Sequence, residues 1–63
     1  MTQQDKIQTV EALERFIAQK GSQNQVAAGM PGVSAATLSQ MRNHKWELIA
    51  DDMWRKVAKY IGV

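Results

Sequence analysis

The sequence predicts a compact all-α domain of four helices. Apolar residues recur at intervals of three and four, the period of a helix that buries one face. Serine and glycine stand where such helices would begin and end. No stretch of the chain alternates apolar and polar residues as a half-buried strand does. We expect one domain, residues 1–63, with helices at about residues 3–20, 22–30, 34–43 and 51–61.

The first helix has one apolar stripe. Its members are Ile7, Val10, Leu13, Phe16 and Ile17. Thr2 followed by Asp5 forms a capping pair at its start, while Thr9 is an alternative cap for a shorter helix. Gly21 follows Lys20 and ends the helix in a left-handed conformation.

The second and third helices are separated by the break Met30-Pro31-Gly32-Val33. Ser22 and Ser34 are the expected N-caps of the two helices. Proline and glycine stop the second helix, and Gly32 is expected to have a positive φ. The second helix is too short to be stable alone, so we expect it to pack against the first and fourth helices. Leu38 and Met41 are the expected inward positions of the third helix.

The fourth helix opens at Ala50-Asp51-Asp52, after a predicted loop over residues 43–48. Its apolar face consists of Met53, Trp54, Val57, Ala58 and Ile61. Ion pairs are expected on its other side, between Asp51 and Arg55 and between Asp52 and Lys56. Trp54 is assigned to the core. Trp46 is assigned to the core edge, with stacking on a partner as the alternative.

The segment "QVAAGMPGVSAATLSQMRNHK" resembles lambda-repressor-like helix-turn-helix domains. The shared features are the small Ala27, the turn glycine Gly32, the start "GVS", the run Thr37-Leu38-Ser39, and Asn43. The resemblance implies that the third helix enters a DNA groove. In that family the small residue and the glycine are usually four apart, and here they are five apart with Pro31 as the extra residue. We therefore expect a longer or differently shaped turn.

A narrower resemblance covers roughly residues 22–61. The run "GVSAATLSQMRNHKWELIADDMWRKVA" is similar to the N-terminal domain of phage Mu-type DNA transposition B proteins, which are AAA ATPases. This resemblance implies that the 63 residues are an excised N-terminal piece of a longer ATPase. No Walker motif occurs in these residues, so the ATPase would lie outside them.

The candidate DNA-binding residues fall into two groups. At the start of the third helix the side chains nearest base edges belong to Ser34, Ala35, Ala36 and Thr37, with Gln40 one turn further on. The alanines offer no hydrogen bond, so we expect sequence-tolerant binding. The residues directed at phosphate are Gln23, Arg42 and Lys45, together with His44 and Lys20. The alternative for the cations that follow the third helix is a solvated loop beside a helix C-terminus.

Composition excludes several function classes. The chain has no cysteine and one histidine, so we expect no metal site, and we expect no cofactor, catalytic residue or small-molecule substrate. A net charge of +2 suits double-stranded DNA as the partner without requiring it. No segment is apolar enough to span a membrane, and we expect a cytoplasmic location.

Two alternative functions stay open. One is a phage repressor or Cro-like transcriptional regulator, which would need a dimer to reach useful specificity. The other is a protein-interaction module that contacts a transposase or another subunit. An apolar patch on the outer face of the third helix would favour the protein-interaction module, and a continuous positive surface there would favour DNA.

Overall fold

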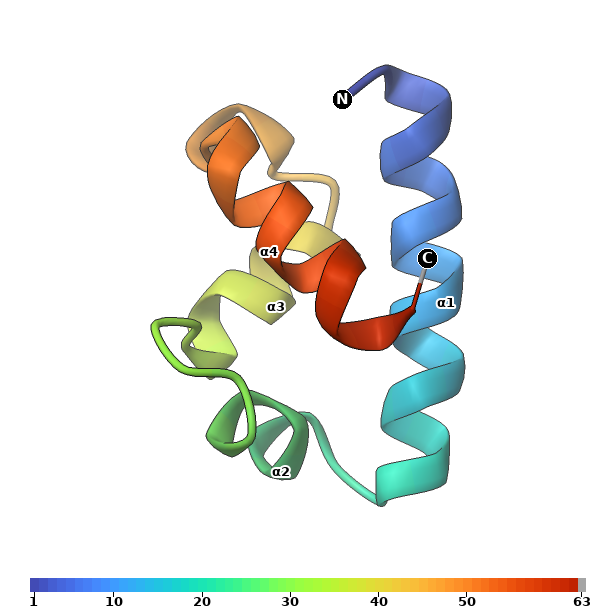
Figure 1. Cartoon of the computed structure of the whole chain (residues 1–63), viewed down its shortest axis with the longest axis vertical. Coiled ribbons are helices and arrows are strands. Elements are labelled where there is room, and N and C mark those ends of the chain that lie inside the picture. Colours follow the sequence, from blue (N-terminus) through green and yellow to red (C-terminus); the bar gives the residue numbers. More distant parts are fainter. Residues whose placement is uncertain (63) are drawn as a thin grey trace.

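Helices account for most of the chain. The computed structural model describes residues 1–62, and in this part of the chain there is no strand. The elements are α1 (Gln3–Lys20), α2 (Gln23–Ala28), α3 (Ala35–Arg42), the 3-10 helix η1 (Trp46–Leu48) and α4 (Asp51–Ile61). The predicted four-helix all-α fold is confirmed. Figure 1 shows α1 along the longest axis of the molecule, with the other helices gathered on one side of it.

The start of α1 is fixed by the capping box at Thr2. The Thr2 hydroxyl accepts a hydrogen bond from the Asp5 N–H at 3.1 Å, and the Asp5 carboxylate accepts one from the Thr2 N–H at 3.3 Å. Thr9, the alternative cap, lies inside the helix and donates its hydroxyl to the Asp5 carbonyl at 2.8 Å. Gly21 ends α1 with a φ of 100°. The longer of the two predicted helices is therefore the one that forms.

Serine caps begin α2 and α3, and both helices are shorter than predicted. The hydroxyls of Ser22 and Ser34 each accept a backbone N–H at 3.2 Å, from Gln25 and Thr37 respectively. Both serines have extended backbone, so each lies just outside the helix that it caps. At the C-terminal end of α2, Pro31 disfavours helical backbone at the residue before it. Met30 accordingly lies in the turn.

The turn between α2 and α3 packs its apolar side chains inward. Met30 and Val33 are both buried, and the Val33 N–H donates to the Met30 carbonyl at 3.1 Å. Between them Gly32 has a φ of 79°, which confirms the predicted positive φ. Four residues separate Gly29, which ends α2, from the cap Ser34. The turn is thus part of the core as well as a connection.

The segment predicted as a loop contains a short helix. Residues 46–48 form η1, in which the Leu48 N–H donates to the Lys45 carbonyl and the Ile49 N–H to the Trp46 carbonyl, each at 3.1 Å. A helix of three residues is too short to show an apolar period, so the sequence pattern did not reveal it. Trp46 donates its indole N–H to the Met41 carbonyl at 2.9 Å and meets the Trp54 ring edge-on. Trp46 therefore lies at the core edge, as predicted.

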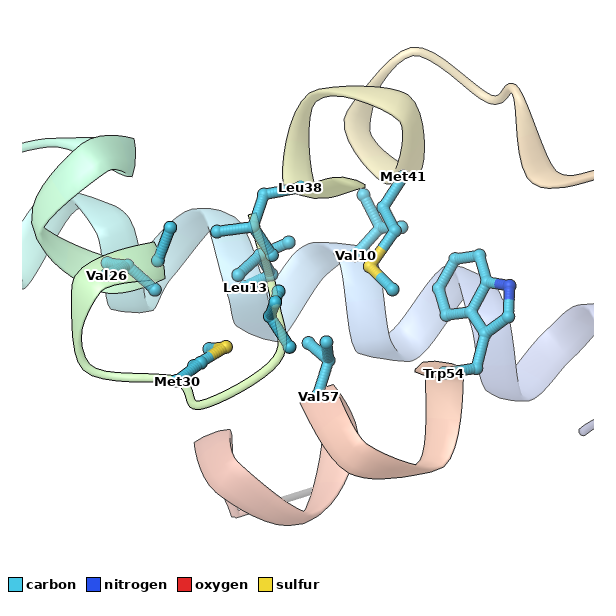
Figure 2. Close-up of a cluster of buried hydrophobic side chains, with 10 residues drawn as sticks. Val10, Leu13, Val26, Met30, Leu38, Met41, Trp54 and Val57 are labelled. Carbon is cyan, nitrogen blue, oxygen red and sulfur yellow. The ribbon is translucent and has the colours of Figure 1, made fainter. Parts of the chain in front are cut away.

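The core lies where α1, α3 and α4 meet, and α2 together with the turn between α2 and α3 closes one end of it (Figure 2). Its fully buried members are Leu13, Leu38, Met41, Trp54 and Val57. The expectation that α2 packs against α1 and α4 is half wrong. Among the described residues α2 packs against α1 and α3, while α4 packs against α1.

The α2–α3 turn makes the contact with α4 that was expected of α2. Lys56 donates its ammonium to the Pro31 carbonyl at 3.2 Å, and this contact replaces the ion pair predicted between Lys56 and Asp52. The other predicted pair is present, with 3.1 Å between the Arg55 guanidinium and the Asp51 carboxylate. Within residues 1–62, no helix is long and apolar enough to cross a membrane.

Replacing Leu38 with alanine tests the assigned core. Leu38 has no exposed surface, so Leu38→Ala should lower the free energy of unfolding by about 2–4 kcal/mol. The matched control is Leu48→Ala, because Leu48 is 63% exposed and its loss should change stability by less than about 0.5 kcal/mol. Thermal and urea unfolding measure both. Equal effects at the two positions would contradict the assigned packing.

A second substitution tests the turn. Gly32→Val should destabilise by about 1–2 kcal/mol, because a side chain strains left-handed backbone. Gly32→Asn should cost less, since asparagine tolerates that conformation. A Cβ at Gly32 would also lie 2.8 Å from the Lys56 ammonium, the movable end of a long side chain. If Lys56→Ala rescued Gly32→Val fully, crowding rather than backbone strain would be the cause.

Candidate nucleic-acid interface

The buried residues of α3 define its outward face. Leu38 and Met41 are fully buried. Because successive residues turn by about 100° around a helix, the opposite stripe carries residues 36, 39, 40 and 43. Ala36 and Asn43 are exposed, and Ser39 and Gln40 are half-buried between them. This is the stripe that α3 can present to a groove.

The predicted base-reading residues at the start of α3 differ in exposure. Ala36 is exposed, whereas Ala35 is half-buried and packs against the core. Ser34 and Thr37 contact each other, with 3.2 Å between their hydroxyl oxygens. The first turn of α3 therefore presents the free methyl group of Ala36, while the hydroxyls of Ser34 and Thr37 are hydrogen-bonded to each other.

Gln23 and Arg42 form a cluster that links α2 to both ends of α3. The Gln23 amide nitrogen donates to the Ala35 carbonyl at 2.9 Å, and its amide oxygen accepts from the Arg42 guanidinium at 2.9 Å. A third helix joins through Glu14 of α1, whose carboxylate oxygen lies 3.7 Å from Arg42 Nε. The structure thus brings together two residues that the sequence had singled out separately.

This Gln23–Arg42–Glu14 cluster holds a cation in a fixed place. Guanidinium carries five N–H donors in a rigid fork, so the donors that Gln23 and Glu14 leave unused remain available to a phosphate. The Arg42 side chain is 38% exposed, which leaves it accessible. Glu14 weakens the attraction of this site for phosphate, because its negative charge lies beside Arg42 and repels a phosphate. Both ends of the Gln23 amide contact the protein itself.

The remaining predicted cations are arranged beyond and beside α3. Lys45 is exposed, and its backbone N–H donates to the Gln40 carbonyl at 2.9 Å. His44 has a φ of 60° and stacks on Trp46 with 4.8 Å between ring centres. Lys20 lies at the end of α1 with its ammonium 5.4 Å from the centre of the Phe16 ring. Arg42 and Lys45 are therefore the exposed cations at the end of α3.

A hollow of about 110 Å³, here called the Leu48 hollow, lies on the other side of the outward stripe. Its lining residues come from α3, η1 and the start of α4, and they are Thr37, Gln40, Leu48, Ile49, Ala50 and Met53. Leu48 is 63% exposed. The sequence does not predict this hollow, because the pattern over residues 43–48 indicates a loop. The available signal was the adjacent apolar pair Leu48-Ile49, which no predicted helix buried.

Among residues 1–62, no three histidine or acidic side chains lie close enough to hold a metal ion. Comparison with protein-family models, curated proteins and solved structures finds no match for this chain. The residues themselves therefore carry the functional argument.

Truncating Gln23 tests whether the cluster contributes to stability. Gln23→Ala removes both amide hydrogen bonds and should lower the free energy of unfolding by about 1–2 kcal/mol. Gln25→Ala is the matched control, since Gln25 belongs to the same short helix but is exposed. Urea unfolding of the two variants gives the comparison. An equally small loss in both would mean that the Gln23 contacts add nothing to the fold.

Proposed function

We propose that this domain binds double-stranded DNA, with α2 and α3 acting as a helix-turn-helix. The observation that carries the proposal is the Gln23–Arg42–Glu14 cluster. It holds a half-exposed guanidinium at one edge of the outward stripe of α3, and Lys45 follows the same helix. In this arrangement α3 faces a groove while the two cations contact the phosphates on its border.

The binding is expected to be largely indifferent to sequence. Ala36 offers a methyl group and no hydrogen bond, and Ser34 and Thr37 bond each other. Gln40 is left as the one long polar side chain of the stripe, at the edge that borders the Leu48 hollow, and it can pair with adenine. Affinity must then come mainly from phosphate contacts.

The resemblance to transposition B proteins gives this binding a biological role. Under the proposal, the domain helps a DNA transposition ATPase to load onto target DNA, where tolerance of sequence is an advantage. Reading the coding sequence around this segment tests that role. An adjoining AAA ATPase with a Walker motif supports it, and a different neighbour removes it while leaving DNA binding itself intact.

Protein binding is the second candidate function, and one observation favours it. The Leu48 hollow is an exposed apolar feature beside the outward stripe of α3, where a module that binds DNA alone has no need of one. The two functions are compatible because the cluster and the hollow lie on opposite edges of the stripe.

DNA titrations at several salt concentrations test the main proposal. Two to four phosphate contacts predict a dissociation constant of roughly 1–100 µM and a slope of log K against log salt of about −2 to −4. Arg42→Ala and Lys45→Ala should each weaken all duplexes equally and flatten the slope by about 1. Glu14→Gln should tighten binding about two- to fivefold, because it removes the opposing charge.

Lys59→Ala serves as the control, since it removes a positive charge from the exposed face of α4. NMR spectra of the labelled protein locate the contact. No shift at low salt in a folded domain would refute DNA binding. A strong preference for one duplex would instead indicate a regulator of the repressor type.

A further inference from the structure

We infer that the Leu48 hollow binds an apolar side chain from a basic helical segment of another protein. This inference goes beyond DNA binding and does not depend on it. It starts from the shape of the hollow. Small-molecule sites occupy about 300–1,000 Å³, and a hollow of about 110 Å³ has room for one aliphatic side chain.

The apolar walls of the hollow, formed by Leu48, Ile49, Ala50 and Met53, are firmly supported. Ile49 and Met53 pack against the core cluster as well as lining the hollow, so their positions are fixed from behind. Leu48 projects from η1 and stays 63% exposed, which leaves much of its apolar surface in water. Covering that surface with another apolar group is favourable, and the hollow is therefore suited to an anchoring side chain.

Charged residues next in sequence to the lining of the hollow indicate the class of partner. Glu47 and Asp52 are each adjacent in sequence to a lining residue, both are exposed, and neither has an ion-pair partner among residues 1–62. Asp51 differs, because it is paired with the Met1 amino group at 2.8 Å and with Arg55. Lys45 is also near, since its backbone N–H donates to the carbonyl of the lining residue Gln40 at 2.9 Å, but the two acids outnumber it. Unpaired acids attract lysine and arginine, and they repel phosphate. A basic protein segment therefore fits this site better than nucleic acid does.

The same charges argue against a second copy of this chain. A two-fold dimer built on the hollow would bring each patch against its own copy. Glu47 and Asp52 would then face like charges, which is costly across an interface. The occupant is better supplied by another protein. Thr37 and Gln40 add polar groups at one wall, where they can orient the bound segment.

A helix is the form of partner that suits this site. A helix presents apolar residues at positions i, i+3, i+4 and i+7 on one face and can carry lysine on its flanks. One leucine would fill the hollow while a neighbouring one covers Leu48. The flanking lysines would then reach Glu47 and Asp52.

The experiment is an NMR titration with two synthetic helical peptides. Both carry leucine at i, i+3, i+4 and i+7, and the remaining positions are lysine in one and glutamate in the other. We expect the lysine peptide to shift the signals of the residues that line the hollow and to bind more tightly than the glutamate peptide. Leu48→Ser should weaken its binding about tenfold or more. Glu47→Gln combined with Asp52→Asn should remove most of the preference for lysine.

Controls keep the outcome decisive. Tyr60→Ser alters the other large exposed hydrophobic residue, 46% exposed on α4, and should leave peptide binding unchanged. All substituted side chains are exposed, and thermal melts confirm that each variant is folded. Equal binding of the two peptides, or full binding by Leu48→Ser, would overturn the inference. So would a DNA duplex that shifts Leu48 and Met53 more strongly than the lysine peptide does.

Discussion

The burial of Leu38 and Met41 beneath α3 is the interaction on which the rest of this structure depends. α2 has six residues and α3 has eight, and helices this short are not stable in isolation. Their stability comes from the apolar surface that they cover together with α1 and α4. Because both inward side chains of α3 are completely buried, the rotation of α3 about its axis is fixed. That rotation decides that Ala36 and Asn43 point outward and that Arg42 meets Gln23.

The turn between α2 and α3 also determines part of the surface that α4 contacts. With Met30 and Val33 buried on either side of it, the tip of the turn at Pro31 and Gly32 stays at the surface. The tip extends far enough for the Pro31 carbonyl to accept a hydrogen bond from the Lys56 ammonium of α4. α4 thus contacts this turn and α1, and it does not pack on α2.

Most of the fold could be predicted from interactions between neighbouring residues. The features that the sequence did not predict depend on contacts between residues far apart in the chain. The serine caps, the capping box at Thr2 and the left-handed Gly32 each depend on a few neighbouring residues, so the sequence was sufficient to predict them. Glu14 was not identified because its contact with Arg42 joins positions far apart in the chain. Gln23 and Arg42 were both predicted, yet their contact with each other follows only from how α2 and α3 pack. The Leu48 hollow was missed for a related reason, since three segments must meet to form it.

The two proposed binding surfaces meet on α3 and are therefore coupled. Gln40 lies in the outward stripe and also lines the Leu48 hollow, and Thr37 belongs both to the first turn of α3 and to the hollow. If α3 enters the groove deeply enough for Gln40 to contact the bases, the duplex would approach the acids Glu47 and Asp52, which repel phosphate. Under the two proposals, DNA would be favoured at the Arg42 edge and a basic protein at the Leu48 edge. A basic segment in the hollow would neutralise those acids and relieve the repulsion on DNA. Partner binding would then strengthen DNA binding unless the partner covers the stripe itself.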